Sequence, residues 1–332
     1  MRYLGSKVST LSALGALVTK RIQNGSFCDP FGGIGSVGTY FCTKGFNITC
    51  GDILHFPHYM QIAKLCFRGD RFFNNLFKHL GVYDINRLTR ILNNGSVSDG
   101  WFIEEYSRSR LYFTDYNSCR IQYCWNLIKE WDDLGVINYN EKAVLLASLI
   151  DSMDRVANTA GTYYAYLKEY NRKSLREFNY EFINTSNVGK EVECLLVSAS
   201  DLIMKRHYDV LYLDPPYNGR SYAHYYHLPE SIARCVTPEV HGLSGVPVGL
   251  VNNSSFNKRE ASTSEFINIV ENANCDLLVF HYSDDGLIER ETIIDKLSKR
   301  GLLEEYVIDC KGYTTSEANR TSSHRVYLSG HG

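Results

Sequence analysis

The chain has 332 residues, 44% of them hydrophobic, which suits one large α/β domain with an insertion or two modest domains and excludes a disordered polymer. Lysine and arginine number 35 against 37 aspartates and glutamates, so the net charge does not indicate a nucleic-acid-binding protein. The ten cysteines form no CxxC pair, which argues against zinc ribbons, and without a recognisable signal peptide or membrane span we expect a cytoplasmic protein.

Strands and helices alternate along most of the sequence. Amphipathic patterns predict helices, and short apolar runs rich in β-branched residues predict buried strands. In chain order these are helices at 8–21 and 36–43, a strand at 46–50, helices at 117–130 and 141–150, strands at 194–197, 210–213 and 277–280, and a helix at 286–300. Two late strands at 305–309 and 324–328 are expected to pair antiparallel at one edge of the sheet. This order predicts an α/β fold with a mostly parallel, Rossmann-like sheet covered by helices on both faces.

The stretch 69–190 breaks this alternation. It is rich in Asn, Tyr, Arg and Lys, and its predicted helices have no strands between them. We therefore predict that 1–68 and 191–332 build the sheet domain, and that 69–190 is a mainly helical insertion with a function of its own.

A glycine-rich turn follows the start of the sheet, in the sequence Asp29-Pro30-Phe31-Gly32-Gly33-Ile34-Gly35. Glycines permit a tight turn and let a ligand approach the backbone. Asp52, which ends the next strand 23 positions after Asp29, suits the two ribose hydroxyls of an adenosine-bearing ligand. An acid at position 29 can meet the ammonium group of S-adenosylmethionine but would repel the pyrophosphate of a dinucleotide. The loop therefore favours a methyltransferase over a nicotinamide-dependent dehydrogenase without excluding the latter.

The apolar strand at 210–213 runs directly into Asp214-Pro215-Pro216-Tyr217. The N6 amine of adenine is a poor nucleophile because its lone pair is delocalised into the ring. The Asp214 carboxylate and the Pro215 carbonyl can accept the two amino hydrogens, and the two prolines fix the backbone that aims this carbonyl. Tyr217 can stack on a base that has left the duplex. An ordinary turn is the alternative, but the position after a buried strand and downstream of the glycine loop favours catalysis.

These motifs resemble those of the D12-class adenine-specific DNA methyltransferases, in the branch of the FokI-type modification enzymes. The resemblance covers nearly the whole chain, from Arg2-Tyr3-Leu4-Gly5-Ser6-Lys7 to Phe280-His281-Tyr282-Ser283. Two further blocks, Leu111-Tyr112-Phe113-Thr114 and Asn158-Thr159-Ala160-Gly161-Thr162-Tyr163, are uncommon among methyltransferases in general and make the match specific. His281 departs from the family pattern, which has serine there.

The resemblance implies S-adenosylmethionine as the cofactor and an α order of motifs, with the target-reading segment before the catalytic loop. Lys7 is expected to meet the cofactor carboxylate, and the alternative is a solvated lysine at the start of a helix. The residues expected at the cofactor are Tyr3, Lys7, Asp29, Pro30, Phe31, Gly33, Gly35, Asp52, Ile53, Asp201 and Asp214, and those expected in catalysis are Asp214, Pro215, Pro216 and Tyr217.

Basic residues and tyrosines are interleaved between 155 and 176, a pattern that suits contacts with DNA phosphates and bases. The alternative is a solvated charged face, and the resemblance favours DNA. The loop at 236–262 either closes over DNA or is a plain surface loop. The residues expected to bind DNA are Arg155, Tyr163, Lys168, Arg172, Lys173, Arg220 and Tyr222.

The spacing of His224, His227 and Glu230 could suggest a metal site. We expect no metal there, because the required geometry needs a helix and Pro229 would begin one only afterwards.

Together, the motifs predict an enzyme that transfers a methyl group from S-adenosylmethionine to N6 of a flipped adenine within a short specific sequence of double-stranded DNA, as the modification enzyme of a restriction–modification system. An RNA or cytosine-N4 methyltransferase on the same fold, an NAD(P)-dependent Rossmann oxidoreductase and a non-catalytic DNA-binding module remain as alternatives. We expect a monomer without membrane attachment, with a cognate restriction endonuclease as a candidate partner.

Overall fold

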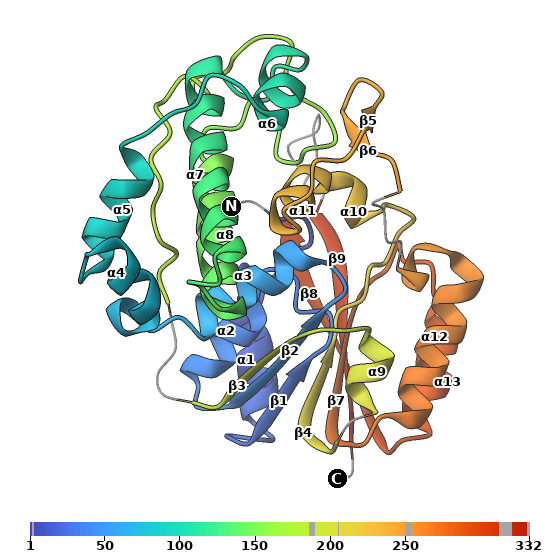
Figure 1. The fold of residues 1–332 in the computed structure, drawn as a ribbon. Coiled ribbons are helices and arrows are strands. Elements are labelled where there is room, and N and C mark those ends of the chain that lie inside the picture. The colour runs from blue at the N-terminus through green and yellow to red at the C-terminus, as the bar shows by residue number, and fades with distance from the viewer. Residues whose placement is uncertain (2, 186–189, 205, 250–253, 312–320, 331–332) are drawn as a thin grey trace. The chain divides into compact units, whose positions relative to one another are not determined.

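The computed structural model describes residues 1, 3–185, 190–204, 206–249, 254–311 and 321–330. Arg2 of the N-terminal motif and residues 250–253 of the predicted loop lie outside this range. The chain forms two compact units, each built from segments that alternate along the sequence (Figure 1). The sheet unit contains Gly5–Ile53, Ser186–Ser221 and Asn253–Gly332, and the helical unit contains Met1–Leu4, Leu54–Thr185 and Tyr222–Asn252.

The sheet unit is organised around seven strands in the order β3-β2-β1-β4-β7-β9-β8. The first five are parallel, β9 runs antiparallel to β7, and β8 pairs antiparallel with β9 at the edge. The predicted mostly parallel sheet with an antiparallel edge pair is thus confirmed. The strands are β1 (Ser26–Asp29), β2 (Asn47–Asp52), β3 (Val192–Leu196), β4 (Tyr208–Leu213), β7 (Cys275–Ser283), β8 (Leu302–Lys311) and β9 (Thr321–Gly330).

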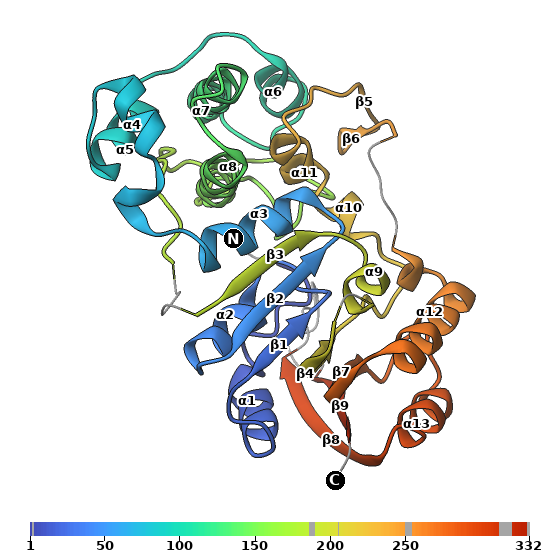
Figure 2. The same cartoon turned by 60° about the horizontal axis from the view of Figure 1, so that its bottom comes forward.

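Helices cover both faces of this sheet, as predicted. Figure 2 shows α1 (Leu11–Thr19) and α2 (Ser36–Thr43) on one side. On the other side lie α9 (Ala199–Ile203), α12 (Arg259–Asn272) and α13 (Arg290–Ser298). A short 3-10 helix, η3 (Ser255–Asn257), precedes α12.

Two sequence predictions in the sheet unit need correction. The helix predicted at 286–300 begins only at Arg290, because residues 284–286 form a turn in which Gly286 lies against the Tyr282 ring. Part of the loop predicted at 236–262 belongs to α12, which starts at Arg259. Helix α12 has no clear amphipathic pattern, because its few buried positions are surrounded by polar residues.

Aromatic side chains fill the core on the face covered by α2. The Phe27 ring from β1 stacks on Phe41 from α2, with centroids 4.1 Å apart, and Phe46 meets Phe41 edge-on at 5.5 Å. The opposite face is a continuous apolar cluster that joins β4 and β7 to α9, α12 and α13. Full burial of these side chains fixes where each strand ends, and the strand ends carry the polar residues discussed below.

The helical unit packs around α8 (Tyr139–Asp154), which is buried along most of its length. Its first turn is closed by a capping box between Asn138 and Glu141. Packed against α8 are α3 (His55–Leu65), α7 (Asp115–Asp133) and α11 (His227–Ala233). The remaining elements are η1 (Gly69–Phe72), α4 (Asn74–Leu80), α5 (Ile85–Asn93), α6 (Trp101–Ile103), the π-helical turn η2 (Glu104–Arg108), α10 (Tyr222–Tyr225) and the two short strands β5 (Val240–His241) and β6 (Val246–Pro247).

The helical unit differs in extent from the predicted insertion at 69–190. It begins at Leu54, so α3 belongs to it, and it also takes in Met1–Leu4 and Tyr222–Asn252. The reason is packing, because α3 and α11 bury their apolar faces against α8. No helix in the described ranges is both long and apolar enough to cross a lipid bilayer.

The stretch 158–183 contains no regular helix, and side-chain amides hold its path. The Asn158 amide donates to the carbonyls of Leu111 and Leu167 at 2.8 and 2.9 Å. Asn117 donates to the Arg176 carbonyl at 2.8 Å and accepts from the Phe178 N–H at 2.8 Å. The two specific sequence blocks at 111–114 and 158–163 therefore meet in the structure, and Asn158 joins them.

Candidate active site

Three carboxylates lie at the carboxyl ends of neighbouring strands. Asp29 ends β1, Asp52 ends β2, and Asp214 directly follows β4. Because β1 lies between β2 and β4, the strand order reverses at this point of the sheet. Open α/β sheets bind their ligands at such a switch point, outside the carboxyl ends of the strands.

Lys7 is the cation of this group. Its Nζ lies 2.7 Å from Asp214 Oδ2, and the two side chains are only 6% and 15% exposed. Nζ also donates to the Gly5 carbonyl at 3.2 Å. Burial raises the pKa of Asp214, and the Lys7 charge and hydrogen bond oppose this rise. Lys7 therefore stabilises the ionised form of Asp214, a contact that the sequence did not suggest.

Asp29 is buried and has one open acceptor. Its pKa lies well above the ordinary value, first because of burial and then because the Asp214 and Asp52 carboxylates repel its charge. Asp29 Oδ1 has no hydrogen-bond partner in the part of the chain that the structure describes. An ammonium donor at this atom would satisfy the acceptor and offset the negative charge of the three acids.

The glycine loop wraps the end of β1 close to the end of β2. Gly33 and Gly35 take left-handed backbone conformations with φ of 49° and 76°, which side chains disfavour. The Gly32 N–H donates to the Gly51 carbonyl at 2.9 Å, and the Gly35 N–H donates to Gly32 at 2.8 Å. Pro30 is buried within this turn, whereas Phe31 and Ile53 are half-buried at its rim. The loop thus leaves backbone and part of the Phe31 ring accessible at the carboxyl end of β1.

The loop after β4 is held from two other elements. The Tyr217 carbonyl accepts from the Leu287 N–H at 3.1 Å. The Asn257 amide donates to the carbonyls of Asn218 and Arg220, each at 2.9 Å. Pro215 is buried, whereas Pro216 and Tyr217 are half-buried. Sequence reasoning missed Asn257, because a lone asparagine in a polar stretch carries no signal.

A buried pair of histidines supports the Tyr217 ring. His324 from β9 meets Tyr217 edge-on, with ring centroids 5.7 Å apart, and meets His281 from β7 at 5.3 Å. His281 Nδ1 lies 2.9 Å from the Tyr212 hydroxyl. Burial and then the nearby Lys7 charge lower the pKa of His324 to about 4, and they place that of His281 well below its usual value. Both rings are therefore neutral at neutral pH, and His281 has a partner that the expected serine could not reach in the same way.

Two residues predicted at the cofactor have other contacts. Tyr3 belongs to the helical unit, where its ring stacks on Tyr226 at 5.1 Å and lies 5.6 Å from Tyr222. Asp201 is exposed in the first turn of α9 and accepts from the Ser198 hydroxyl at 2.6 Å. The structure thus accounts for Asp201 as part of a helix cap.

The residues predicted to bind DNA fall into different environments. Tyr163 is 1% exposed, and its hydroxyl lies 3.3 Å from Asp154, so the prediction of a surface contact at Tyr163 is corrected. Burial excludes its ring from any contact with DNA in this conformation. Arg155 is exposed but forms ion pairs with Asp151 and Glu181.

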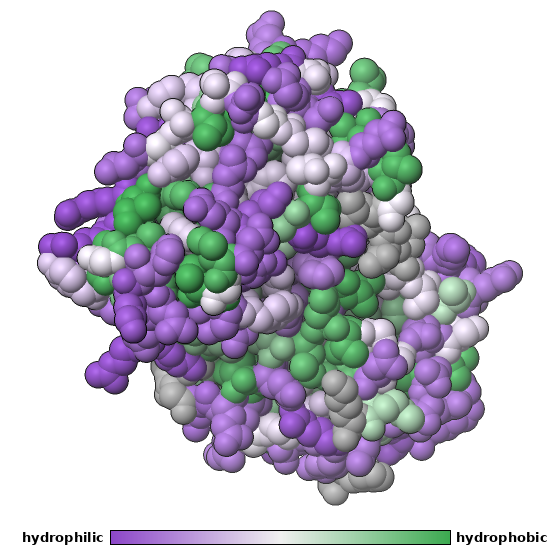
Figure 3. Space-filling view, viewed as in Figure 1, coloured by the Kyte–Doolittle hydropathy of each residue, from purple (hydrophilic) through white to green (hydrophobic). Residues whose placement is uncertain are grey.

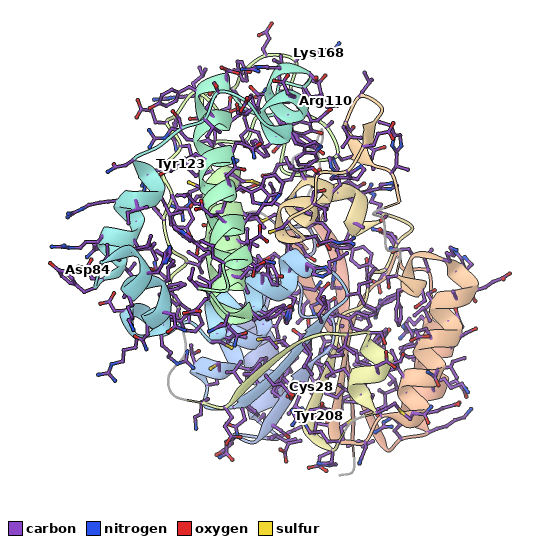
Figure 4. All side chains as sticks on the ribbon, in the orientation of Figure 1. Cys28, Asp84, Arg110, Tyr123, Lys168 and Tyr208 are labelled. Atoms are coloured by element: carbon purple, nitrogen blue, oxygen red, sulfur yellow. The ribbon has the colours of Figure 1, made fainter. Side chains whose placement is uncertain are left out.

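The other predicted DNA contacts reach the surface. Lys168, labelled in Figure 4, is exposed, as are Arg172 and Arg220. Lys173 and Tyr222 are half-buried.

The helix expected to begin only at Pro229 starts earlier in the structure. α10 (Tyr222–Tyr225) and α11 (His227–Ala233) both start before Pro229, so His224 and His227 lie on helical turns. Glu230 instead accepts from the His55 ring and from the Phe56 N–H. His227 Nε2 lies 2.8 Å from the Tyr163 carbonyl, and burial lowers the pKa of His227 to about 4. In the described ranges, no group of three His, Cys, Asp or Glu side chains is placed to hold a metal ion.

The sheet order, the glycine loop and the Asp-Pro-Pro-Tyr turn at the switch point define a Rossmann-like methyltransferase fold. The chain belongs to the D12 class N6 adenine-specific DNA methyltransferases, whose family model matches residues 3–295. This membership accounts for the catalytic turn, for which a nicotinamide-dependent oxidoreductase would have no use.

Three relatives illustrate the similarity. The type II methyltransferase M.FokI of Planomicrobium okeanokoites is 32% identical over 93% of this chain and 48% of its own length. The modification methylase LlaI of Lactococcus lactis subsp. lactis is 30% identical over 96% of this chain and 52% of its own length. The type II methyltransferase M.NlaIII of Neisseria lactamica is 25% identical over 97% of this chain and 96% of its own length. The chain therefore spans about half the length of the first two relatives and nearly all of the third.

Proposed function

We propose that the protein transfers the methyl group of S-adenosylmethionine to the N6 amino group of an adenine flipped out of a short specific sequence in duplex DNA. The observation that carries this proposal is Asp214, which lies at the switch point of the sheet, paired with Lys7 and followed by two prolines and a tyrosine. Family membership supports the choice of adenine N6, and the relatives' names as type II methyltransferases and modification methylases support a role in restriction–modification.

The cofactor proposal rests on the fit of the switch-point residues. Asp29 Oδ1 is the acceptor for the ammonium group, Asp52 for the ribose hydroxyls, and Phe31 forms an apolar wall. When bound, S-adenosylmethionine supplies an electrophilic methyl group on sulfur. Gly33 and Gly35 let the cofactor lie against the backbone of the loop.

The chemical proposal concerns the two acceptors at the catalytic turn. The Asp214 carboxylate and the Pro215 carbonyl accept the two amino hydrogens, which draws the N6 lone pair out of the ring and makes the nitrogen nucleophilic. Lys7 keeps Asp214 ionised until the substrate is in place. The raised pKa of Asp214 then makes this carboxylate a suitable acceptor for the proton that N6 loses as the nitrogen–carbon bond forms. Tyr217 stacks on the base, with its ring supported by His324.

The DNA proposal keeps the exposed members of the predicted set. Lys168, Arg172 and Lys173 are proposed phosphate contacts on the helical unit, and Arg220 is one on the sheet unit. Arg155 would have to release Asp151 or Glu181 before it could take a phosphate. The buried Tyr163 is not included.

Long-read sequencing of DNA from an unmodified host that expresses the protein tests this function. We expect N6-methyladenine in one short motif, and its absence when the host expresses Asp214→Ala. Asp276→Asn is the matched control, because this carboxylate on β7 is exposed and its ion-pair partner among the described residues is His207. Methylation of RNA or of cytosine instead, or a motif that persists with Asp214→Ala, would contradict the proposal.

A further inference from the structure

A four-residue turn at the tip of the β5–β6 hairpin presents a bare leucine. β5 and β6 pair antiparallel, with Val240 opposite Pro247, and residues 242–245 form the turn between them. Leu243 is 86% exposed, more than any other large apolar side chain among the described residues. Apolar surface appears at the outer end of this hairpin in Figure 3.

The tip is held rigidly, unlike an ordinary surface loop. The Tyr106 hydroxyl donates to the Gly245 carbonyl at 2.8 Å, and Arg110 donates to the Gly242 carbonyl at 3.2 Å. The Tyr112 hydroxyl is shared between the Tyr163 carbonyl at 2.8 Å and the Ser244 carbonyl at 2.9 Å. Both tyrosines are fully buried. Three carbonyls on either side of Leu243 are thus occupied by side chains from one neighbouring segment, 106–112.

Gly245 shows how closely this segment approaches the tip. Its φ of 67° is left-handed, and an added Cβ would lie 2.8 Å from Nε of Arg110. Arg110 is itself fixed by Glu105, with Nη1 2.6 Å from Oε2. A scattered exposed leucine needs no explanation, but one displayed on a turn whose backbone is fixed by three side chains points to a partner.

The surroundings of the tip favour DNA as that partner. The Ser244 hydroxyl donates to the Tyr164 carbonyl, so the tip adjoins the segment that carries Lys168, Arg172 and Lys173. Figure 4 shows Arg110 and Lys168 toward the same end of the helical unit. Glu239 and Glu169 are exposed acids nearby in the sequence. Glu104 and Asp115, exposed on either side of the 106–112 segment, both pair with Arg108. Val248 beside the hairpin and Tyr164 beside the tip are also exposed, at 59% and 55%. Because cations lie among these residues, the apolar tip suits a wedge between base pairs of DNA.

We propose that Leu243 enters the base stack of duplex DNA and fills space left when the target adenine flips out, which rests on the proposed methyltransferase function. A flipped base leaves its former neighbours unstacked, and an apolar side chain on a pre-ordered turn recovers part of the lost contact. Leu243 acts in the base-flipping step, so replacement of Leu243 slows methylation more than it weakens DNA binding.

The test compares four full-length proteins: wild type, Leu243→Ala, Leu243→Phe and the control Leu134→Ala. Leu134 is 57% exposed at the end of α7 in the same unit, so it matches the size and exposure of the change. The substrate is a duplex with the sequence found by long-read sequencing, with 2-aminopurine at the target position to report unstacking by its fluorescence. DNA affinity and the single-turnover methylation rate on the adenine duplex are measured alongside.

We expect Leu243→Ala to bind the duplex within roughly threefold of wild type but to lose most of the fluorescence rise, and to methylate at least about tenfold more slowly. Leu243→Phe and Leu134→Ala should behave like wild type. A mismatch at the target pair, which makes flipping easier, should restore the rate of Leu243→Ala.

A wild-type rate and fluorescence with Leu243→Ala would overturn the wedge while leaving the methyltransferase intact. The same holds if the substitution instead changes the sedimentation of the protein, because Leu243 would then contact a second copy. A wild-type protein that methylates no duplex at all would overturn the methyltransferase proposal and the wedge together.

Discussion

The two units differ in where they place the residues that the sequence predicted for cofactor and DNA binding. In the sheet unit, Asp29, Asp52 and Asp214 are far apart in sequence, yet the charges of Asp52 and Asp214 lie close enough to Asp29 to raise its pKa. In the helical unit, neighbours within 155–176 separate into the interior, as Tyr163 does, and the surface, as Lys168 does. The carboxyl ends of parallel strands lie along one edge of the sheet, so residues at these ends come together. In a stretch without regular structure, neighbouring residues can point to different sides.

Lys7→Met is the substitution expected to lower the methylation rate most at the sheet site. Without the ammonium group the pKa of Asp214 rises further, because burial already raises it and only Lys7 opposes this. Asp214 is then protonated at higher pH, so the acidic limb of the methylation rate moves to higher pH and the rate at neutral pH falls by roughly 10²-fold. Single-turnover rates measured across the pH range check this, with Lys7→Arg as the control that keeps the charge. An unmoved acidic limb would show that the ion pair does not govern catalysis.

Asp29→Asn is expected to change the stability of the protein and its affinity for the cofactor in opposite directions. Because the folded-state pKa of Asp29 is raised, its stabilising contribution is present at low pH and is lost as the pH rises through that pKa. The neutral amide should therefore increase the free energy of unfolding at neutral pH by roughly 1–3 kcal/mol, with the gain vanishing in acid. Urea unfolding without cofactor at both pH values measures this, and cofactor affinity should fall.

Asp209→Asn is the control for the sign of this effect. Hydrogen bonds from Ser26 lower the pKa of Asp209, so its contribution is present above the ordinary pKa and is lost in acid. Its replacement should destabilise the protein at neutral pH. Equal effects of the two substitutions would refute the electrostatic explanation.

The helical unit is tested by the double substitution Arg172→Ala and Lys173→Ala. Loss of two phosphate contacts should reduce the slope of log affinity against log salt by about 2 and weaken DNA binding roughly tenfold at moderate salt. Filter binding at several salt concentrations measures both quantities. Lys78→Ala with Arg90→Ala is the matched pair of exposed cations in the same unit, and it should leave the slope unchanged. An unchanged slope for the first pair would remove this segment from the DNA contact.

Tyr163→Phe should give the smallest effect. The change removes one buried hydroxyl at 3.3 Å from Asp154, so it should cost at most about 1 kcal/mol of unfolding free energy and leave the salt dependence of DNA binding as it is. Thermal unfolding and filter binding check this. A clear loss of DNA affinity without loss of stability would return Tyr163 to the DNA surface.

The sheet unit could be predicted from the sequence, because buried strands are apolar runs and site residues follow their carboxyl ends. Apolar runs located β2, β3, β4 and β7, and acids at strand ends located Asp29, Asp52 and Asp214. It could not place Tyr163, because tyrosine suits both the interior and a DNA surface. The path of 158–183 depends on contacts of Asn158 with Leu111 and of Asn117 with Arg176, which are distant in sequence. It also missed His324 and Asn257, since their roles exist only once β9 and η3 are folded beside the catalytic loop.

The alternation of the two units along the chain has a consequence during synthesis. β1 ends at Asp29, but β4, which covers its open edge, begins at Tyr208. At roughly 5–20 residues per second, the ribosome needs about 10–40 s to make the intervening chain. During this interval β1 presents an unpaired edge to other nascent chains while the Leu54–Thr185 segment emerges. The yield of native protein should therefore depend on how fast the chain is translated, and on chaperones that shield β1, more than on the final stability of the sheet.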